Sequence, residues 1–329
     1  MTLPRRQFLH LAAGAAVIPA VSRIATAQTY PARPITVIVP FPAGGTADTI
    51  ARIVGEHMSR TLGQPAIVEN VGGAGGTTGS IRAMRANPDG YTIVMGTMGT
   101  HGASVGFYPK LAYKPDVDFA PIGLAAGTPM LIVAKKEFPA NDLQEFISYV
   151  RTHADKLNVS HAGAGSTMFT TCLLLHSVLN VKPTMIPFTG VGAVNALVAG
   201  QVDYTCDIAV TSIPQLKAGT IKAYAILTEE RHPILPNVPT STEAGLPDVR
   251  VTAWNGLFAP KATPKAVLDR LTDALDKALD HDGTRNRLVD LGCDIPGKTR
   301  RGQQPLAELV KSEIARWTPI INAAGVKAE

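Results

Sequence analysis

Four short segments rich in glycine and hydroxyl residues could bind an anion through their backbone amides. They comprise residues 44–46, 96–101, 163–167 and 189–192. Three of them precede helical patterns, so each would present the free N–H groups and the positive dipole end of a helix. Glycine leaves these amides accessible because it has no Cβ. The segments therefore predict a site for a small anion.

Neutral groups would hold this anion, because the four segments contain no lysine or arginine. Ordinary helix capping explains any one segment equally well. Their spread along the chain favours a cleft in which the anion lies between two lobes. Asp48 falls in the first helical turn after residues 44–46, and Arg52 follows it by four residues. This spacing favours an ion pair with Arg52 over ligand contact by Asp48.

One stretch matches a nucleotide-binding motif, but its surroundings do not fit. Residues 292–299, GCDIPGKT, satisfy G-x-x-x-x-G-K-[ST]. A functional loop of this type follows a strand and begins a helix, whose amides hold the phosphates. Here a helical pattern precedes the stretch, RRGQQP follows it, and Pro296 has no amide hydrogen. We interpret the match as a coincidence. No segment contains the dinucleotide-binding pattern G-x-G-x-x-G, so no cofactor is predicted.

The remaining candidate catalytic groups form no familiar set. The chain lacks G-x-S-x-G and H-E-x-x-H, and His101, His161 and His176 are far apart in the sequence. Asp203 and Asp207 lie in one strand-like run and would point to the same face. A carboxylate pair for acid–base chemistry therefore stays open as an alternative.

The cysteine pattern argues against a zinc site or a redox motif. Cys172, Cys206 and Cys293 are odd in number and show no C-x-x-C spacing. One disulfide and three buried thiols are the two alternatives. We expect no metal ion and no enzymatic activity.

The first 27 residues are typical of an export signal. PRRQFLH supplies paired arginines, FLHLAAGAAVIPA supplies an apolar segment too short for a membrane span, and a small-residue cleavage site ends at Ala27. Paired arginines indicate the twin-arginine pathway, with general secretion as the alternative.

Without this segment, 28 basic side chains oppose 26 acidic ones, so charge gives no reason to expect nucleic acid as a partner. We expect a soluble protein of the periplasm.

Short β-branched runs alternate with helical patterns along the mature chain, which favours parallel sheets flanked by helices. The predicted strands are residues 34–39, 66–70, 91–95, 131–135, 157–161, 184–188, 202–206 and 222–227. The predicted helices are residues 46–62, 142–154, 166–180, 264–281 and 304–321.

Two extended segments, residues 127–129 and 254–256, are interpreted as crossings between two lobes. A chain of 329 residues is long enough for two domains. We therefore predict an α/β protein with a two-segment hinge and a ligand cleft between its lobes. Residues 28–127 and 254–329 would form lobe 1, and residues 128–253 would form lobe 2.

Several longer motifs, taken together, carry a family resemblance. They are YPARPITVIVPFPAGGTADTIAR, VENVGGAGGTTGS, NPDGYTIVMGTMGTH, LAYKPDVDFAPIG, GAGST, GQVDYTCD, LPNVPTSTEAGLPD and WNGLFAPKATP. With them the chain resembles the periplasmic substrate-binding proteins of tripartite tricarboxylate transporters, the Bug or TctC-like family, over essentially the whole mature chain. The resemblance implies a type II periplasmic binding fold that closes on a small carboxylate and delivers it to a membrane permease.

The resemblance also implies which residues contact the ligand. The first-lobe contacts would be Gly44, Gly45, Thr46, Asp48, Thr97, Thr100 and His101. The second-lobe contacts would be Ala164, Gly165, Ser166, Thr167, Thr189, Gly190 and Gly192, with Asp207 at the pocket wall.

Two departures from the family pattern bear on the choice of ligand. Phe169 stands where members often have histidine, and Pro187-Phe188-Thr189-Gly190 replaces Pro-Tyr-Lys-Gly. Both changes remove polar groups, so we hypothesise a preference for an apolar or aromatic carboxylate over citrate-like polyacids. The alternative is that Phe169 packs in the lobe core.

Two other functions stay open at this point. An exported enzyme on the same scaffold could use Asp203, Asp207 or His101, although no metal set, cofactor motif or nucleophile–base pair supports it. A sensor whose closed form signals to a histidine kinase would carry the same sequence features as a transport receptor.

Overall fold

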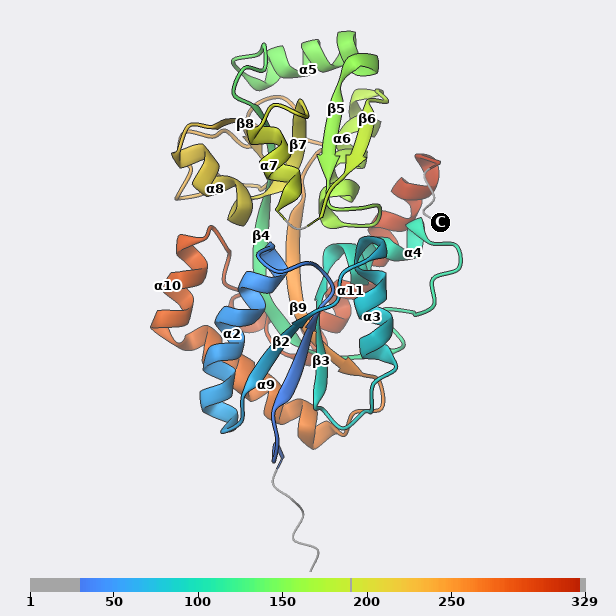
Figure 1. Cartoon of the computed structure of the whole chain (residues 1–329), viewed down its shortest axis with the longest axis vertical. Helices are drawn as coiled ribbons and strands as arrows, with labels where there is room; N and C mark the ends of the chain where they lie inside the picture. The colour runs from blue at the N-terminus through green and yellow to red at the C-terminus, as the bar shows by residue number, and fades with distance from the viewer. Residues whose placement is uncertain (1–29, 190, 326–329) are drawn as a thin grey trace, which may run out of the picture.

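The computed structural model describes residues 30–189 and 191–325, which form two α/β lobes (Figure 1). The predicted export signal, residues 1–27, lies outside the described residues. The strands are β1 (Ile35–Val39), β2 (Ala66–Asn70), β3 (Thr92–Thr97), β4 (Phe119–Lys135), β5 (Asn158–His161), β6 (Thr184–Pro187), β7 (Tyr204–Ile208), β8 (Ile221–Ile226) and β9 (Thr252–Pro260). The α-helices are α2 (Thr46–Leu62), α3 (Thr77–Met84), α4 (Ser104–Phe107), α5 (Leu143–His153), α6 (Thr167–Leu179), α7 (Gly192–Val198), α8 (Ala209–Lys217), α9 (Lys265–Asp280), α10 (Asp282–Asp290) and α11 (Gln303–Ala323). Shorter turns are η1 (Ala74–Gly76), the π-helical η2 (Gly99–Ala103), η3 (Ala154–Lys156) and η4 (Lys298–Arg300).

The sheet order is β2-β1-β3-β9-β4-β7-β5-β6, with β8 also paired to β4. β1 is parallel to β2 and β3, and β5 is parallel to β6 and β7. The expectation of parallel sheets is wrong for the centre, where β9 is antiparallel to β3 and β4, and β4 is antiparallel to β7 and β8. The reason is that β4 leads out of lobe 1 and β9 leads back into it.

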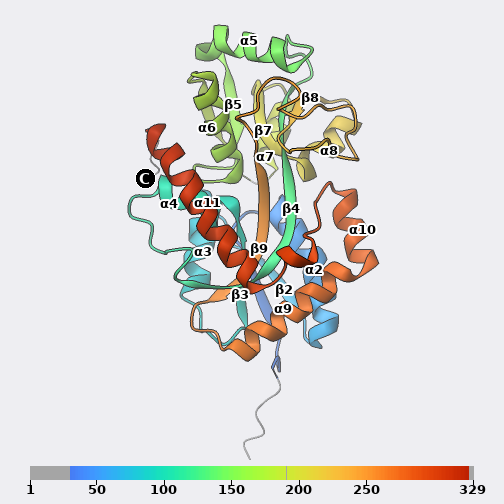
Figure 2. The same cartoon turned by 180° about the vertical axis from the view of Figure 1, so that it is seen from behind.

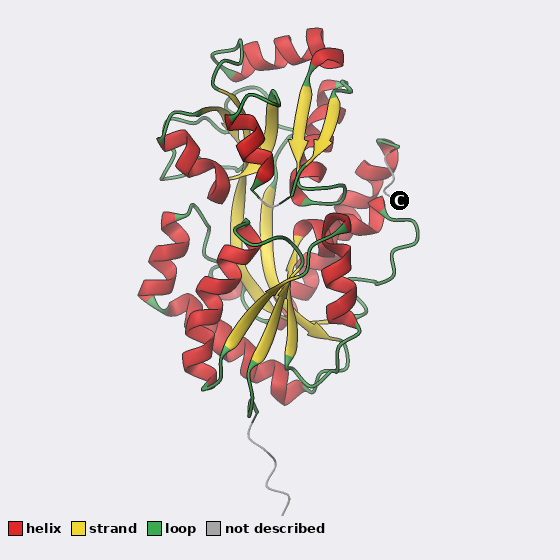
Figure 3. Cartoon of the chain, in the orientation of Figure 1, coloured by secondary structure: helices red, strands yellow, loops and turns green. Residues whose placement is uncertain are grey.

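β4 and β9 carry the chain between the lobes and lie side by side, with Gly127 opposite Trp254. Figure 3 shows both as long strands along the axis of the molecule. Residues 119–129 of β4 pair with β9, and residues 130–135 pair with β7 and β8, so β4 belongs to both lobes. The lobe boundaries at 127/128 and 253/254 stay a prediction.

The helices bury apolar stripes against these strands and against each other. In α2 the residues Ile50, Ile53, Val54, Met58 and Leu62 recur at helical spacing, and all are buried. This stripe packs against β1 and α9. The helix α11 begins near β4 and slants past η2 and α4 toward α6 of lobe 2 (Figure 2). The packing fixes the amino end of α2 at the edge of the sheet where the lobes meet.

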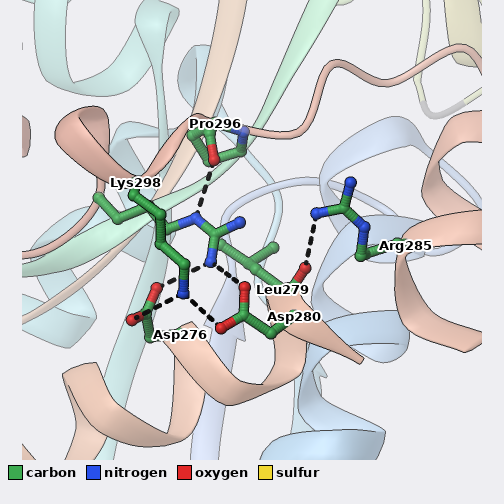
Figure 4. A network of polar contacts seen from close by, with 7 residues as sticks. Asp276, Leu279, Asp280, Arg285, Pro296 and Lys298 are labelled. Carbon is green, nitrogen blue, oxygen red and sulfur yellow. Dashed lines mark hydrogen bonds and ion pairs between the residues drawn. The ribbon is translucent and has the colours of Figure 1, made fainter. Parts of the chain in front are cut away.

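The stretch that mimics a nucleotide-binding loop is tied to α9 by ion pairs (Figure 4). Lys298 Nζ binds the carboxylate of Asp280 and lies 3.7 Å from Asp276. Arg301 Nη1 lies 2.9 Å from Asp276 and 2.7 Å from Asp280, and its Nε donates to the Pro296 carbonyl at 2.8 Å. The 3₁₀ turn η4 contains Lys298, where a phosphate loop would begin an α-helix. These contacts give Lys298 a structural role.

Candidate ligand-binding site

A cavity of about 390 Å³ lies between the two lobes. Both lobes and both crossing strands line it, including Thr46 and Thr97 from lobe 1 and Ser166 and Thr167 from lobe 2. Asp207 is the one charged side chain among the described lining residues. An anion in this cavity would therefore depend on amide and hydroxyl donors.

The amino end of α2 opens onto the cavity. Gly44 has a φ of 83°, a left-handed backbone that glycine adopts without strain, and it turns the chain from β1 into the helix. Gly45 caps the helix without a side-chain hydrogen bond. The first bond of the helix runs from the Thr49 amide to the Gly45 carbonyl at 3.0 Å, so the amides of residues 46–48 have no partner inside the helix. They and the helix dipole favour an anion at this point.

Asp48 is occupied by protein donors. Its carboxylate accepts hydrogen bonds from the Gly44 amide at 2.9 Å, from Asn70 Nδ2 at 2.9 Å and from Arg52 Nε at 3.0 Å. Burial alone would raise the pKa of Asp48, but the hydrogen bonds from Arg52, Gly44 and Asn70 outweigh it and lower the pKa. Asp48 thus fixes the turn before α2, and it lies outside the cavity lining.

The amino end of α6 lines the cavity from the opposite side. The Ser166 hydroxyl caps the helix by accepting a hydrogen bond from the Phe169 amide at 3.2 Å. The Thr170 amide donates to the Ser166 carbonyl at 2.9 Å, so the amides of Thr167 and Met168 have no partner within the helix. Two helix amino ends, one from each lobe, therefore meet at one cavity.

Asp207 lies at the end of β7 and is 2% exposed. Its Oδ2 accepts hydrogen bonds from Thr211 Oγ1 at 2.8 Å and from Ser212 Oγ at 2.6 Å. Burial raises the pKa of Asp207, although the hydrogen bonds from Ser212, Thr211 and the Ile208 backbone act in the opposite direction. An ionised Asp207 would repel an anionic ligand, so its protonation state affects what the cavity binds.

The structure brings about half of the predicted site residues together. The residues that line the cavity are Gly45, Thr46, Thr97, Ser166, Thr167, Thr189 and Asp207. The residues that lie outside the lining are Gly44, Asp48, Thr100, His101, Ala164, Gly165 and Gly192. Gly190 lies outside the described residues.

Thr100 and His101 are fully buried behind the cavity wall. The His101 ring stacks on Phe258 with 4.3 Å between ring centroids, and its Nδ1 lies 2.9 Å from Thr100 Oγ1. Burial lowers the pKa of His101 to about 3, so the imidazole is neutral at ordinary pH. Thr100 Oγ1 accepts from the Thr97 amide at 3.0 Å. These two residues thus support the end of β3, where Thr97 reaches the cavity.

The lining also includes residues that were not assigned from the sequence. They are Phe41, Pro42, residues 73–76, Thr128, Met168, Trp254 and Asn255, among others. The glycine run at 73–76 and the crossing segment near Trp254 were both visible as motifs. Only the pairing of distant strands, such as Thr97 opposite Asn255, brings them to one place.

The possible carboxylate pair does not form. Asp203 binds Lys135 Nζ at 2.6 Å and accepts from the Asn158 amide at 2.8 Å. Four residues of extended chain separate it from Asp207, a span of about 13 Å. Asp203 therefore anchors the start of β7 to the end of β4 and takes no part in the cavity.

The two other candidate histidines, His161 and His176, and the three cysteines are buried. His161 and His176 have pKa values lowered to about 4 by burial, and the Tyr204 hydroxyl lies 2.9 Å from His176 Nε2. The residues Cys172, Cys206 and Cys293 are free, buried thiols. Within residues 30–189 and 191–325, no three histidine, cysteine or acidic side chains are arranged to hold a metal ion.

The two aromatic departures have different positions. Phe188 lines the cavity and is half-buried. Phe169 lies outside the lining, is 6% exposed, and packs against Phe107 with 5.2 Å between ring centroids and against His161 with 4.7 Å. Phe169 therefore packs among buried side chains, as the core-packing alternative predicts.

None of the helices in the described part of the chain is both long enough and apolar enough to cross a membrane.

The sequence matches a family described as "Tripartite tricarboxylate transporter family receptor" over residues 50–326. Three solved structures are similar over nearly the whole chain. MatC from Rhodopseudomonas palustris with bound malate is 50% identical, with 89% of this chain and 100% of that chain covered and a TM-score of 0.86. The periplasmic binding protein BugD is 37% identical, with 91% and 100% covered and a TM-score of 0.86. R. palustris Rpa4515 with adipate is 31% identical, with 91% and 99% covered and a TM-score of 0.85.

Proposed function

The chain belongs to the receptor family of the tripartite tricarboxylate transporters, and from this premise we propose that it captures a small carboxylate in the periplasm and delivers it to a membrane permease. The observation that carries this proposal is the meeting of two helix amino ends, α2 and α6, at one cavity without a basic side chain among its described lining residues. Amides and hydroxyls from opposite lobes suit a carboxylate that bridges them.

We propose that the ligand carboxylate lies between Thr46 and Thr97 on one side and Ser166 and Thr167 on the other. Each of these residues lines the cavity and supplies a hydroxyl, and Thr46 and Thr167 also supply backbone amides that have no partner within their helices. With donors on both lobes, the ligand makes contacts in the closed form that it cannot make in the open form. Ligand binding therefore shifts the population of receptor molecules toward the closed form.

A dicarboxylate of malate size is the ligand class we favour. MatC, which is 50% identical, was solved with malate, and Rpa4515 was solved with adipate. The apolar wall around Phe188, Met168 and Trp254 also suits a longer or aromatic carbon skeleton. With Phe169 outside the lining, the hypothesis of an aromatic ligand depends on Phe188.

A thermal-shift screen of the mature protein tests the ligand class. The protein would be heated with malate, succinate, adipate, citrate, terephthalate and, as controls, glucose and lysine. A ligand that binds only the folded state stabilises it by RT ln(1 + [L]/Kd), which is about 2.7 kcal/mol at a concentration of 100 Kd. We expect a shift with malate or another dicarboxylate and none with the controls. A shift with lysine or glucose alone would overturn the proposal.

Delivery to a permease is tested in cells. Deletion of the permease genes of the cognate transporter should abolish uptake of the labelled dicarboxylate while the receptor is still exported. Deletion of the receptor gene tests the alternative: normal uptake together with a lost transcriptional response to the ligand would support a sensor role instead.

A further inference from the structure

The two lobes touch directly beside the cavity. The Tyr108 hydroxyl, which follows α4 in lobe 1, lies 2.9 Å from the Ala74 carbonyl and 2.8 Å from the Ala164 carbonyl. Ala74 belongs to η1 of lobe 1, and Ala164 belongs to the loop between β5 and α6 of lobe 2. A phenol has one hydrogen to donate, so Tyr108 shares it between carbonyls of the two lobes.

Two glycines of lobe 1 leave room for the same lobe 2 loop. A Cβ added at Gly75 would lie 1.9 Å from the Ala164 carbonyl oxygen. A Cβ added at Gly99 would lie 2.6 Å from the Gly165 carbonyl oxygen and 2.9 Å from the Thr167 amide nitrogen. Carbon atoms do not approach backbone atoms this closely, so neither position accepts a side chain while the lobes are in contact.

Two more contacts cross between the lobes at this point. The Gly99 amide donates to Thr167 Oγ1 at 3.2 Å, and the Phe107 ring packs on Phe169 at 5.2 Å. Phe107 and Phe169 are both buried. The contact therefore combines shape, hydrogen bonds and apolar packing, as a specific interface does.

We propose that Gly75, Gly99 and Tyr108 of lobe 1 and residues 163–169 of lobe 2 form a latch that sets how much of the receptor is closed, and thereby its affinity. Gly99, Tyr108, Ala164 and Phe169 lie outside the cavity lining, so they act on the ligand through closure. Gly75, Gly163 and residues 166–168 of the latch also line the cavity. The apparent Kd equals the intrinsic Kd divided by the closed fraction. This inference rests on the proposed function for its ligand and on the lobe contacts for its mechanism.

The variant Gly99→Ala gives the sharpest test. Gly99 has an ordinary backbone conformation, and the three atoms nearest to an added Cβ all belong to lobe 2. Alanine should therefore fit the open form without strain and obstruct closure. Gly297→Ala is the matched control, because Gly297 also has an ordinary backbone and no atom lies within 4 Å of an added Cβ.

The readouts are calorimetric titration with malate, small-angle scattering with and without malate, and urea unfolding. We expect Gly99→Ala to raise the Kd by about tenfold or more and to keep a larger radius of gyration than Gly297→Ala, with an unchanged urea midpoint. Tyr108→Phe removes one hydroxyl and should raise the Kd by about two- to tenfold. If Gly99→Ala failed to fold, Tyr108→Phe would carry the test.

Equal Kd values and equal radii for Gly99→Ala, Tyr108→Phe and Gly297→Ala would overturn the latch. In another outcome, the wild-type protein binds no carboxylate while Gly99→Ala still has a larger radius of gyration than Gly297→Ala. That result would contradict the proposed function and support the latch. The two proposals therefore fail in different ways.

Discussion

At the scale of single residues, an acidic side chain inside an anion site decides how that site responds to pH. Asp207 faces the cavity with two hydroxyl donors on Oδ2, and burial raises its pKa. As pH falls through this raised pKa, protonation removes a negative charge beside the ligand. Affinity for a carboxylate should then rise, apart from the titration of the ligand itself.

The variant Asp207→Asn isolates this effect. Asparagine keeps an oxygen that accepts from Thr211 and Ser212 but carries no charge, so the variant should bind malate more tightly than wild type at pH 8, by up to about tenfold. The ratio of the two Kd values should approach one at low pH, where the ligand titrates identically in both proteins. Weaker binding by the variant at every pH would show that the Asp207 carboxylate accepts a hydrogen bond from the ligand.

A second residue-scale prediction concerns Asp48. Its pKa is lowered in the folded state, so its contribution to stability is present above pH 4 and is lost as pH falls through the folded pKa. The variant Asp48→Asn should lower the free energy of unfolding by about 1–3 kcal/mol at pH 7, because charge-assisted hydrogen bonds are lost. Urea unfolding beside Asp248→Asn, an exposed control, measures it. Equal midpoints would contradict the role given to Asp48.

Residue roles were only partly predictable from the sequence. The spacing of Asp48 and Arg52 was enough to predict their ion pair, because both lie on one helix. The positions of His101 and Phe169 depend on rings from other elements, Phe258 and Phe107, which no local pattern identifies.

At the scale of elements, the predictable parts were those with a strong local pattern. Strands rich in valine and isoleucine, such as β1, and amphipathic helices, such as α2, lie where the pattern placed them. The first half of β4 and most of β9 read FAPIGLAAGT and AWNGLFAP, with glycine, alanine and proline in place of β-branched residues. These strands form because they pair with each other, so their extent was not visible in the sequence.

Lobe 2 carries buried histidines on β5 and α6 that link its stability to pH. The pKa values of His161 and His176 are lowered to about 4, so the unfolded chain binds more protons between about pH 4 and 6.5. The stability that the two neutral histidines contribute is therefore fully present above about pH 6.5, and it is lost as the pH falls toward about 4. Each histidine contributes at most about 3 kcal/mol to this loss.

The variant His176→Gln should reduce the slope of unfolding free energy against pH in this window. Glutamine keeps a polar group near the Tyr204 hydroxyl but does not titrate. Urea unfolding of both proteins at pH 7.5, 6.0 and 5.0 gives the two slopes. Parallel curves would show that His176 does not take up a proton on unfolding.

At the scale of the whole molecule, the proposed function depends on the two lobes meeting around the ligand. The helix amino ends of α2 and α6 come from different lobes, so the proposed site needs both lobes. The sequence pattern predicted two lobes and loops that bind an anion. It did not indicate that part of the second loop, Ala164 and Gly165, contacts the opposite lobe beside the cavity.

A crystal structure of the mature protein grown with malate is the most direct test of the central claim. We predict a ligand carboxylate in the cavity, within hydrogen-bonding distance, about 2.7–3.2 Å, of amides or hydroxyls from both Thr46 of α2 and Thr167 of α6. Malate bound to one lobe alone, or bound outside the cavity with both helix amino ends unoccupied, would contradict the account.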